Sequence, residues 1–400
     1  MKTKKSKTIL LLGGGNEQLP AILEAKKFGY KVVCIDKDKD CIGKKYSDFF
    51  YHISIKQTKK IESIFKKHKI KGVASICSDI AVPVVSYLSN KYKLSSLDIK
   101  QSKILTNKFY MKKFFKKNNI RTPNFHLYKN LNLAKKFINK QKLPIIVKPS
   151  VSFGQKGVSK ISDLKNLRKK IIDAKKISLD KKVIIENFEK GIELNVVAIA
   201  HNKKAIFLSF SDRIIYQDKG FGIAYEHRHP SSIKIKIIKK IKLIVKRIIK
   251  KMNLNNAVIY PQFIINKNPQ LIEIAGRVPG GYMREVSMLA SGIDPVKFQI
   301  LTAMQEKNIF AKIKNVPQKK SIYVKFFTKK DFKIISDINF KNIQKAKSKK
   351  GIYKIFFNRI NKIPSLKDSS SRFGVLISYG KNIKESKLNA DRAIKIIKLK

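Results

Sequence analysis

The sequence PIIVKPSVSFGQKGV, residues 144–158, joins an apolar strand to a lysine and then to a loop that contains two glycines. Lys148 ends the apolar run, and a lysine that projects from a buried strand costs desolvation energy unless it meets an anion. In the following loop, Gly154 and Gly157 permit backbone N–H groups to approach phosphate oxygens closely. A strand lysine followed by a glycine-containing loop therefore predicts a site for a nucleotide triphosphate.

The next strand along the chain, within VIIENFEKGIE (residues 183–193), carries acids that suit the remaining parts of a nucleotide. Glu186 ends the apolar run and can accept a hydrogen bond from an adenine amino group, while Glu193 can accept from both ribose hydroxyls. Between them, Phe188 and Glu189 can offer backbone groups to the adenine edge. Taken alone, each acid has a simpler interpretation as a surface carboxylate. Their placement at strand ends, in a chain with only 27 acids, favours the site.

The segment AVIYPQFIINKNPQLIEIAGRVPGG, residues 257–281, has the pattern of a hairpin, with two apolar strands around the turn NKNPQ. This pairing places Gln262 opposite Glu273. A carboxylate and an amide carbonyl at cross-strand range, with triphosphate oxygens nearby, form the hard-oxygen site that Mg²⁺ prefers. Arg277 follows on the next loop, where its guanidinium can hold a carboxylate or an acyl phosphate through two hydrogen bonds.

The first hundred residues alternate strand and helix patterns, which predicts a parallel, doubly wound α/β sheet. Gly13, Gly14 and Gly15 match a dinucleotide fingerprint only in part, because Gln18 occupies the place of its third glycine. We therefore expect a tight strand-to-helix turn there. The basic start of the chain precedes an apolar run that is too short for a signal peptide, which favours a buried strand.

The pattern changes from residue 104. The segment ILTNKFYMKKFFKKNNIRTP (residues 104–123) is predicted to form one helix that stops before Pro123. Because 400 residues exceed what one hydrophobic core usually serves, two or three domains are expected. We divide the chain into a parallel α/β domain, a central domain with α+β subdomains and a small C-terminal α+β region, over residues 1–103, 104–310 and 311–400.

The formal charge of +62 raises the question of a nucleic-acid partner. Only ten of the 89 basic residues are arginine, and the lysines are spread through nearly every expected helix and loop. Proteins that read nucleic acids favour arginine and gather their charge in one patch. Codon bias is therefore the preferred explanation, and a polyanion partner remains the alternative because so positive a surface attracts polyanions.

The sequence lacks the motifs of several classes of enzyme and of membrane proteins. The sequence has no P-loop, no nucleophile elbow, no HExxH and no apolar run that approaches the ~20 residues of a membrane helix. Three scattered cysteines form no disulfide framework, which suits a cytoplasmic protein. His227 and His229 are spaced to face one way on a strand, and we expect them to face solvent or substrate rather than a metal.

In this order the elements resemble the ATP-grasp superfamily, in the branch that includes biotin carboxylase, carbamoyl-phosphate synthetase and D-alanine–D-alanine ligase. The resemblance covers essentially the whole chain and implies an ATP-grasp fold preceded by a parallel α/β pre-ATP-grasp domain over residues 1–103. The segment TNKFYMKKFFKKNNIRTP is similar to the family's lysine-bearing helix, which implies that Lys108 lies by the phosphates. The closing strand and helix of the family resemble RFGVLISYGKNIKESKLNADRAIKII.

The other motifs take roles in the same way. The resemblance implies that Lys148 and the glycine loop hold the phosphates of ATP, with Glu186 at the adenine and Glu193 at the ribose. Glu273 and Gln262 would hold one or two Mg²⁺ ions. The family usually has an acid in place of Gln262 and an asparagine in place of Ala275, so the number of ions is open.

The activity implied is a carboxylate–amine or carboxylate–thiol ligation. A substrate carboxylate attacks the γ-phosphate of ATP to give an acyl phosphate and ADP, and a nucleophile then displaces phosphate while Arg277 holds the reacting carboxylate. The expected partners are small-molecule carboxylates and amines, with a homodimer possible. One alternative is a biotin-carboxylase-like or purine-pathway enzyme that uses bicarbonate. Another is a degenerate ATP-binding scaffold that binds polyanions.

Overall fold

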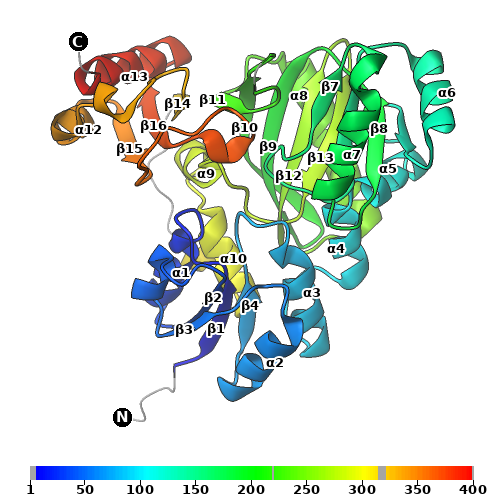
Figure 1. The fold of residues 1–400 in the computed structure, drawn as a ribbon. Coiled ribbons are helices and arrows are strands. Elements are labelled where there is room, and N and C mark those ends of the chain that lie inside the picture. Colours follow the sequence, from blue (N-terminus) through cyan, green and yellow to red (C-terminus); the bar gives the residue numbers. More distant parts are fainter. Residues whose placement is uncertain (1–5, 219, 314–320, 399–400) are drawn as a thin grey trace, which may run out of the picture.

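A computed structural model describes residues 6–398 except 219 and 314–320. These residues form three β-sheets, one parallel and two antiparallel (Figure 1). The parallel sheet belongs to the N-terminal part at the bottom of the view, and the strands of the C-terminal part, in orange and red, lie at the upper left. This is the mixed α/β architecture that the sequence predicts.

The first sheet is parallel and has the order β3-β2-β1-β4. Alternate residues of β1 enter two cores: Ile9 and Leu11 belong to one, and Leu10 and Leu12 to the other. Burial on both faces is typical of a parallel sheet covered by crossover helices, which confirms the doubly wound prediction. The elements are β1 (Thr8–Leu12), α1 (Leu19–Lys27), β2 (Lys31–Asp36), β3 (Phe49–His52), α2 (Thr58–Lys67), β4 (Gly72–Ala74) and α3 (Ala81–Lys91).

Two helices follow α3 where one was predicted. They are α4 (Ile99–Thr106) and α5 (Lys108–Lys117), and the chain turns between them at Asn107, which has φ −117° and ψ 112°. The Asn107 side chain accepts hydrogen bonds from the backbone N–H groups of Phe109 and Tyr110, so it caps the start of α5. The prediction of one helix over residues 104–123 is therefore wrong, and the break places Lys108 in the first turn of α5.

The second sheet is small and antiparallel, with the order β5-β8-β6-β7. Its strands are β5 (Phe125–Leu127), β6 (Ile145–Pro149), β7 (Ser159–Ile161) and β8 (Val183–Asn187), and α6 (Leu131–Gln141) and α7 (Leu167–Ile177) pack on it through one shared core. Residues 151–158 connect β6 to β7, so the glycine loop joins two neighbouring strands.

The third sheet has eight antiparallel strands in the order β13-β12-β9-β10-β11-β14-β16-β15. Its strands are β9 (Ile192–His201), β10 (Lys204–Ile215), β11 (Ala224–His229), β12 (Ala257–Ile265), β13 (Pro269–Ala275), β14 (Ser321–Phe327), β15 (Ile352–Phe357) and β16 (Gly374–Gly380). The sheet contains the predicted hairpin, in which Gln262 pairs with Glu273. A second hairpin joins β9 to β10 and turns at Asn202 and Lys203, which have positive φ.

Helices cover this sheet on both faces. The long helix α8 (Ile235–Met252) packs on β9, β12 and β13 in one core, and α9 (Met283–Ser291) and α10 (Pro295–Ala303) contribute to the core that also contains β1. Shorter helices are α11 (Ile309–Lys312) and α12 (Ile343–Lys347), and α13 (Ile383–Ile397) packs on β14 and β16. The predicted boundary between the central domain and the C-terminal region lies between residues 310 and 311, and strands from both sides of it belong to this one sheet. The division into three domains stays a prediction.

Candidate active site

A cavity of about 640 Å³ lies where the three parts of the chain meet. It is lined by the turn after β1, by β6 and its glycine loop, by β8, and by strands β9 to β13 of the large sheet. The segments around Asn358 and Arg372 line it from the C-terminal part. Every predicted site residue except Gly157 lines this cavity. Residues predicted from seven separate segments are therefore brought together.

Two lysines share one buried carboxylate at the nucleotide end of the cavity. The ammonium of Lys148, on β6, forms an ion pair with Glu186 Oε1 on the neighbouring strand β8. Lys112, on α5, lies with its Nζ 2.7 Å from Glu186 Oε2 and donates to Thr122 Oγ1 at 2.9 Å. The three charged side chains are at most 5% exposed. Two cations beside one anion leave a net positive charge where phosphate oxygens are expected.

Burial and charge act in opposite directions on these groups. Burial opposes ionisation of Glu186, but Lys112 and Lys148 outweigh it, so the pKa of Glu186 is lowered. Burial lowers the pKa of Lys112 to about 8, although Glu186 favours its charged form. Lys112 was not predicted from the sequence. It lies four residues after Lys108, on the same face of α5, and this spacing was the available signal.

Lys108 lies between the glycine loop and the large sheet. Its Nζ donates to the carbonyl of Ser152 at 2.9 Å and lies 3.9 Å from Glu273 Oε2. The start of α5 is fixed to the end of β6, because Lys108 N donates to the carbonyl of Ser150 at 2.9 Å and Asn107 Nδ2 donates to Asp180 at 3.0 Å. The Ser150 hydroxyl donates to the same Asp180 carboxylate. Lys108 and Lys148 are thus held in a fixed relation.

The loop of residues 151–158 contacts several other segments, and its first residue, Val151, is hydrogen-bonded to Ser178 and Leu179 after α7. Beyond the bond from Lys108, its Gly154 carbonyl accepts from Ser369 N at 3.0 Å in the turn Ser369–Ser371. Gln155 packs closely against Gly222, because a Cβ atom on Gly222 would lie only 2.9 Å from Gln155 Oε1. Gly154 and Gly157 have φ of +65° and +75°, a region that only glycine adopts without cost. The loop therefore spans the cavity from the small sheet to the C-terminal part.

We expect this loop to open in the absence of nucleotide and to be held closed by it. Its contacts are single hydrogen bonds with little apolar burial, which is typical of segments with low local stability. Hydrogen–deuterium exchange of a peptide that covers residues 151–158 should slow clearly when Mg²⁺ and a non-hydrolysable ATP analogue are added. A peptide from β1, which is buried in both cores, serves as the control and should not change. Equal exchange of the loop with and without nucleotide would contradict this expectation.

Oxygen and nitrogen groups form a row across neighbouring strands at the floor of the cavity. Asn195 on β9 pairs in register with Gln262 on β12, and Gln262 pairs with Glu273 on β13. Gln262 Nε2 donates to Asn195 Oδ1 at 2.9 Å, which turns Gln262 Oε1 away from that bond. A bulge in β13 turns Ile272 and Glu273 toward the cavity together, although Leu271 is in the core.

This row fits Mg²⁺ through one carboxylate and one amide oxygen. Mg²⁺ is usually held by one or two carboxylates together with substrate phosphates and water, and Glu273 with Gln262 Oε1 meets that requirement. Among the residues that the structure describes, no group of three or more His, Cys, Asp and Glu side chains is placed to hold a metal by itself. His227 lies behind Asn195 at 3.4 Å, and burial, then Arg213 and Arg372, lower the pKa of His227 well below its usual value.

Two predicted residues have partners that the sequence did not reveal. Arg277 donates from Nε and Nη2 to the two oxygens of Asp79, at 2.7 and 2.6 Å, in a bidentate pair with the N-terminal domain. Burial opposes ionisation of Asp79, but Arg277 outweighs it and lowers the pKa of Asp79. Glu193 forms an ion pair with Arg213 of β10, whose second nitrogen donates to the carbonyl of Gly222.

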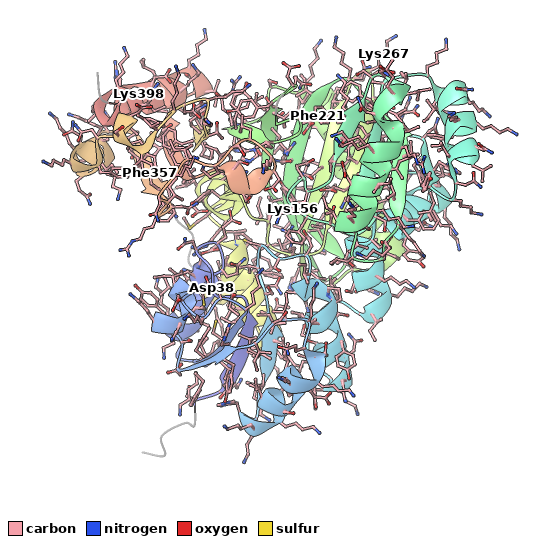
Figure 2. All side chains as sticks on the ribbon, in the orientation of Figure 1. Asp38, Lys156, Phe221, Lys267, Phe357 and Lys398 are labelled. Carbon is pink, nitrogen blue, oxygen red and sulfur yellow. The ribbon has the colours of Figure 1, made fainter. Side chains whose placement is uncertain are left out.

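The remaining predicted residues lie on the segment after β8. Phe188 and Glu189 line the cavity next to Phe221, which is labelled in Figure 2, and the rings of Phe188 and Phe221 are 6.2 Å apart. Lys160 lies over the Phe188 ring. Sequence reasoning missed Asp79, Arg213 and Arg372. The contacts of Asp79 and Arg372 join segments far apart in the sequence, whereas Arg213 lies on the strand that pairs with the strand of Glu193, so the pairing of β9 with β10 was the available signal.

Comparisons with known proteins agree with this arrangement. Residues 106–279 match the family model of the phosphoribosylglycinamide synthetase ATP-grasp (A) domain. Formate-dependent phosphoribosylglycinamide formyltransferase from Methanococcus maripaludis is 24% identical over 197 residues, which are 46% of this chain and 48% of that protein. The large chain of carbamoyl phosphate synthase from Helicobacter pylori is 25% identical over 232 residues, 52% of this chain and 21% of that protein. The chain thus matches about half the length of the first relative and less of the second.

Solved structures are similar over nearly the whole chain. An L-amino acid ligase from Bacillus licheniformis has a TM-score of 0.80 at 16% identity and covers 99% of this chain and 98% of its own. Phosphoribosylglycinamide synthetase from Anaerococcus prevotii has a TM-score of 0.77 at 22% identity, with 99% and 100% covered. At these identities the likeness shows the fold. The match over residues 106–279 identifies an ATP-grasp (A) domain within the chain, and the whole chain shares the fold of these two enzymes.

Proposed function

We propose that the chain is an ATP-dependent ligase that activates a small carboxylate as an acyl phosphate and transfers it to an amine, with release of ADP and phosphate. The observation that carries this proposal is the row of Asn195, Gln262 and Glu273, which lies in the same cavity as Lys108 and Lys148. The lysines would bind phosphate oxygens, and the loop of residues 151–158 would exclude water from the acyl phosphate.

The other predicted residues have proposed roles that agree with their places. Glu186 would accept from the adenine amino group, and Glu193 from the ribose. Glu273 and Gln262 would hold Mg²⁺, which supplies charge neutralisation at the phosphates. Arg277 would hold the reacting carboxylate through the guanidinium edge that faces away from Asp79, while the pair with Asp79 fixes its orientation. A thiol nucleophile, a homodimer and a cytoplasmic location stay predictions.

Trapping with hydroxylamine tests the reaction. A panel of small carboxylates is incubated with Mg-ATP and hydroxylamine, which captures an acyl phosphate as a hydroxamate. We expect ADP release and hydroxamate formation in equal amounts with at least one carboxylate. ADP release that depends on bicarbonate and gives no hydroxamate would favour the carboxylating alternative. ATP binding without ADP release under any of these conditions would overturn the proposal.

The distribution of the basic side chains (Figure 2) differs from the single patch that is typical of proteins that read nucleic acids. Figure 2 shows nitrogen-tipped side chains projecting from every side of the outline rather than from one face. Within the described residues, no helix has the length and apolar content needed to cross a bilayer. In contrast to the dispersed basic side chains, the residues that line the cavity come from several distant segments and gather in one place.

Substitution of Glu273 by glutamine should remove the carboxylate of the proposed Mg²⁺ site. We expect ADP release to fall about 100-fold or more, since a metal ion contributes several kcal/mol of charge stabilisation at phosphoryl groups. The concentration of Mg²⁺ that gives half-maximal activity should also rise, because Gln262 cannot supply the missing charge. Both are measured by ADP release over a Mg²⁺ titration.

Glu62→Gln is the matched control, because Glu62 is also close to a lysine, Lys91, but lies on α2, outside the cavity lining. It should leave both readouts unchanged. If Glu273→Gln keeps the wild-type Mg²⁺ dependence, Glu273 is not a metal ligand.

A further inference from the structure

Two side chains of opposite charge, to which the proposed function gives no role, face the same end of the cavity. Glu17 follows the glycine turn after β1, and Arg372 lies just before β16, so they come from opposite ends of the chain. Both approach the loop after β13. A Cβ built on Gly280 would lie 2.4 Å from Glu17 Oε2, and one on Gly281 would lie 3.6 Å from Arg372 Nη1. One short loop therefore separates an anion from a cation.

The guanidinium of Arg372 is held in place without a carboxylate. It lies over the ring of Phe326, with Cζ 4.2 Å from the ring centroid, and its Nε donates to the carbonyl of Ser369 at 3.0 Å. In the part of the chain that the structure describes, Arg372 forms no ion pair, whereas the other two arginines of the cavity are neutralised, Arg213 by Glu193 and Arg277 by Asp79. Stacking on a ring fixes the guanidinium plane and leaves its edge available for a carboxylate.

Burial alone does not remove this charge. It lowers the pKa of Arg372 while Glu17 raises it, and an arginine with its ordinary value far above neutrality stays protonated. Arg372 therefore brings a fixed positive charge to the cavity wall. Because the charge is partly desolvated there, a bound anion interacts with it more strongly than it would in water.

Glu17 is the matching anion. Its Oε1 accepts from Gly281 N at 3.1 Å, and within the described residues it forms no ion pair with a lysine or an arginine. The pKa values of neighbouring Cys77 and Tyr282 are raised by burial and, next in size, by the charge of Glu17. The carboxylate thus makes this side of the cavity negative, opposite the positive edge of Arg372.

We infer that this end of the cavity binds a small zwitterion, a molecule that carries a primary ammonium and a carboxylate a few bonds apart, as an α-amino acid does. The inference rests on the proposed function, because the zwitterion would be one of the two substrates. Arg372 binds its carboxylate, and Glu17 binds its ammonium. A phosphate-bearing ligand fits the same charges less well, because Glu17 repels a second negative charge.

Calorimetric titration tests the inference directly. The wild-type chain, saturated with Mg²⁺ and a non-hydrolysable ATP analogue, is titrated with each proteinogenic L-amino acid and with ribose 5-phosphate. Each amino acid that binds is compared with the acid that lacks its amine and the amine that lacks its carboxylate, such as propionate and ethylamine for L-alanine. We expect at least one amino acid to bind, and both partial molecules to bind at least about tenfold more weakly, a loss of roughly 1.4 kcal/mol. Binding of no amino acid, or tighter binding of ribose 5-phosphate than of any amino acid, overturns the inference.

Substitutions test whether Glu17 and Arg372 are the residues that bind the amino acid. Glu17→Gln and Arg372→Met should each weaken binding of that amino acid at least about tenfold, with little change in affinity for the ATP analogue. Arg372→Lys keeps the cation and should retain part of the affinity, and Arg359→Met, at an exposed arginine, is the matched control. Unchanged amino acid affinity in both Glu17→Gln and Arg372→Met overturns the assignment. Failure of the wild type to bind the ATP analogue would count against the proposed function instead, so the two failures are distinguishable.

Discussion

Replacement of Lys148 by methionine should weaken Mg-ATP binding about 10- to 100-fold, the range expected when one charged hydrogen bond worth roughly 1.5–3 kcal/mol is lost. Lys148 lies near the end of β6 beside the glycine loop, and its ammonium is paired with Glu186. We propose that ATP competes for this lysine, because its phosphates carry more negative charge than one carboxylate. The affinity is measured by calorimetric titration with Mg-ATP or its non-hydrolysable analogue.

The same variant should leave the nucleotide-free protein at least as stable as the wild type. Removing one partner of a buried ion pair is normally strongly destabilising, but Lys112 remains 2.7 Å from Glu186, so the carboxylate keeps a cation. Glu186→Gln, in contrast, leaves two buried lysines together and should lower the melting temperature. Lys182→Met, at an exposed lysine just before the neighbouring strand β8, is the control for ATP binding. If Lys148→Met has a much lower melting temperature but normal ATP affinity, Lys148 stabilises the fold and does not bind ATP.

The sequence predicted the parts of this site that local patterns determine. Apolar runs that end in Lys148 and Glu186 identified two strands, and these strands pair with both side chains at the cavity. The hairpin around NKNPQ was predicted with Gln262 opposite Glu273, and the structure has this pair. The turn fixes the register as far as Phe263 and Leu271, and a bulge that the sequence did not reveal completes the pair.

Contacts between distant segments could not be read from one sequence. Arg277 and Asp79 are 198 residues apart, and nothing near either one indicates the other. Lys112 was missed because its spacing of four residues from Lys108 does not distinguish it in a chain with 89 basic residues. The break between α4 and α5 depends on the side chain of Asn107, which caps α5. Such a cap stabilises a helix start by about 1 kcal/mol. The pattern of apolar residues does not reveal so small a difference in free energy between one continuous helix and two.

Substitution of Arg277 by methionine should lower turnover about 100- to 1,000-fold while Mg-ATP affinity changes little. The expected size is that of losing one preorganised donor to the charge that develops in a transition state. The bidentate pair with Asp79 fixes the guanidinium before substrate arrives, and such preorganisation costs nothing at the moment of reaction. Turnover is measured as hydroxylamine-dependent ADP release, and affinity by titration with the ATP analogue.

Two further variants separate catalysis from structure. Arg277→Met leaves Asp79 buried without its partner, so the double variant Asp79→Asn/Arg277→Met removes the uncompensated charge and should recover stability without recovering turnover. Arg284→Met is the matched control, because Arg284 is also paired with buried carboxylates, those of Asp294 and Glu24, but lies outside the cavity lining. It should lower the melting temperature and leave the turnover of the folded protein unchanged. If the double variant regains wild-type turnover, the activity loss came from the orphaned Asp79, and Arg277 does not act on the substrate.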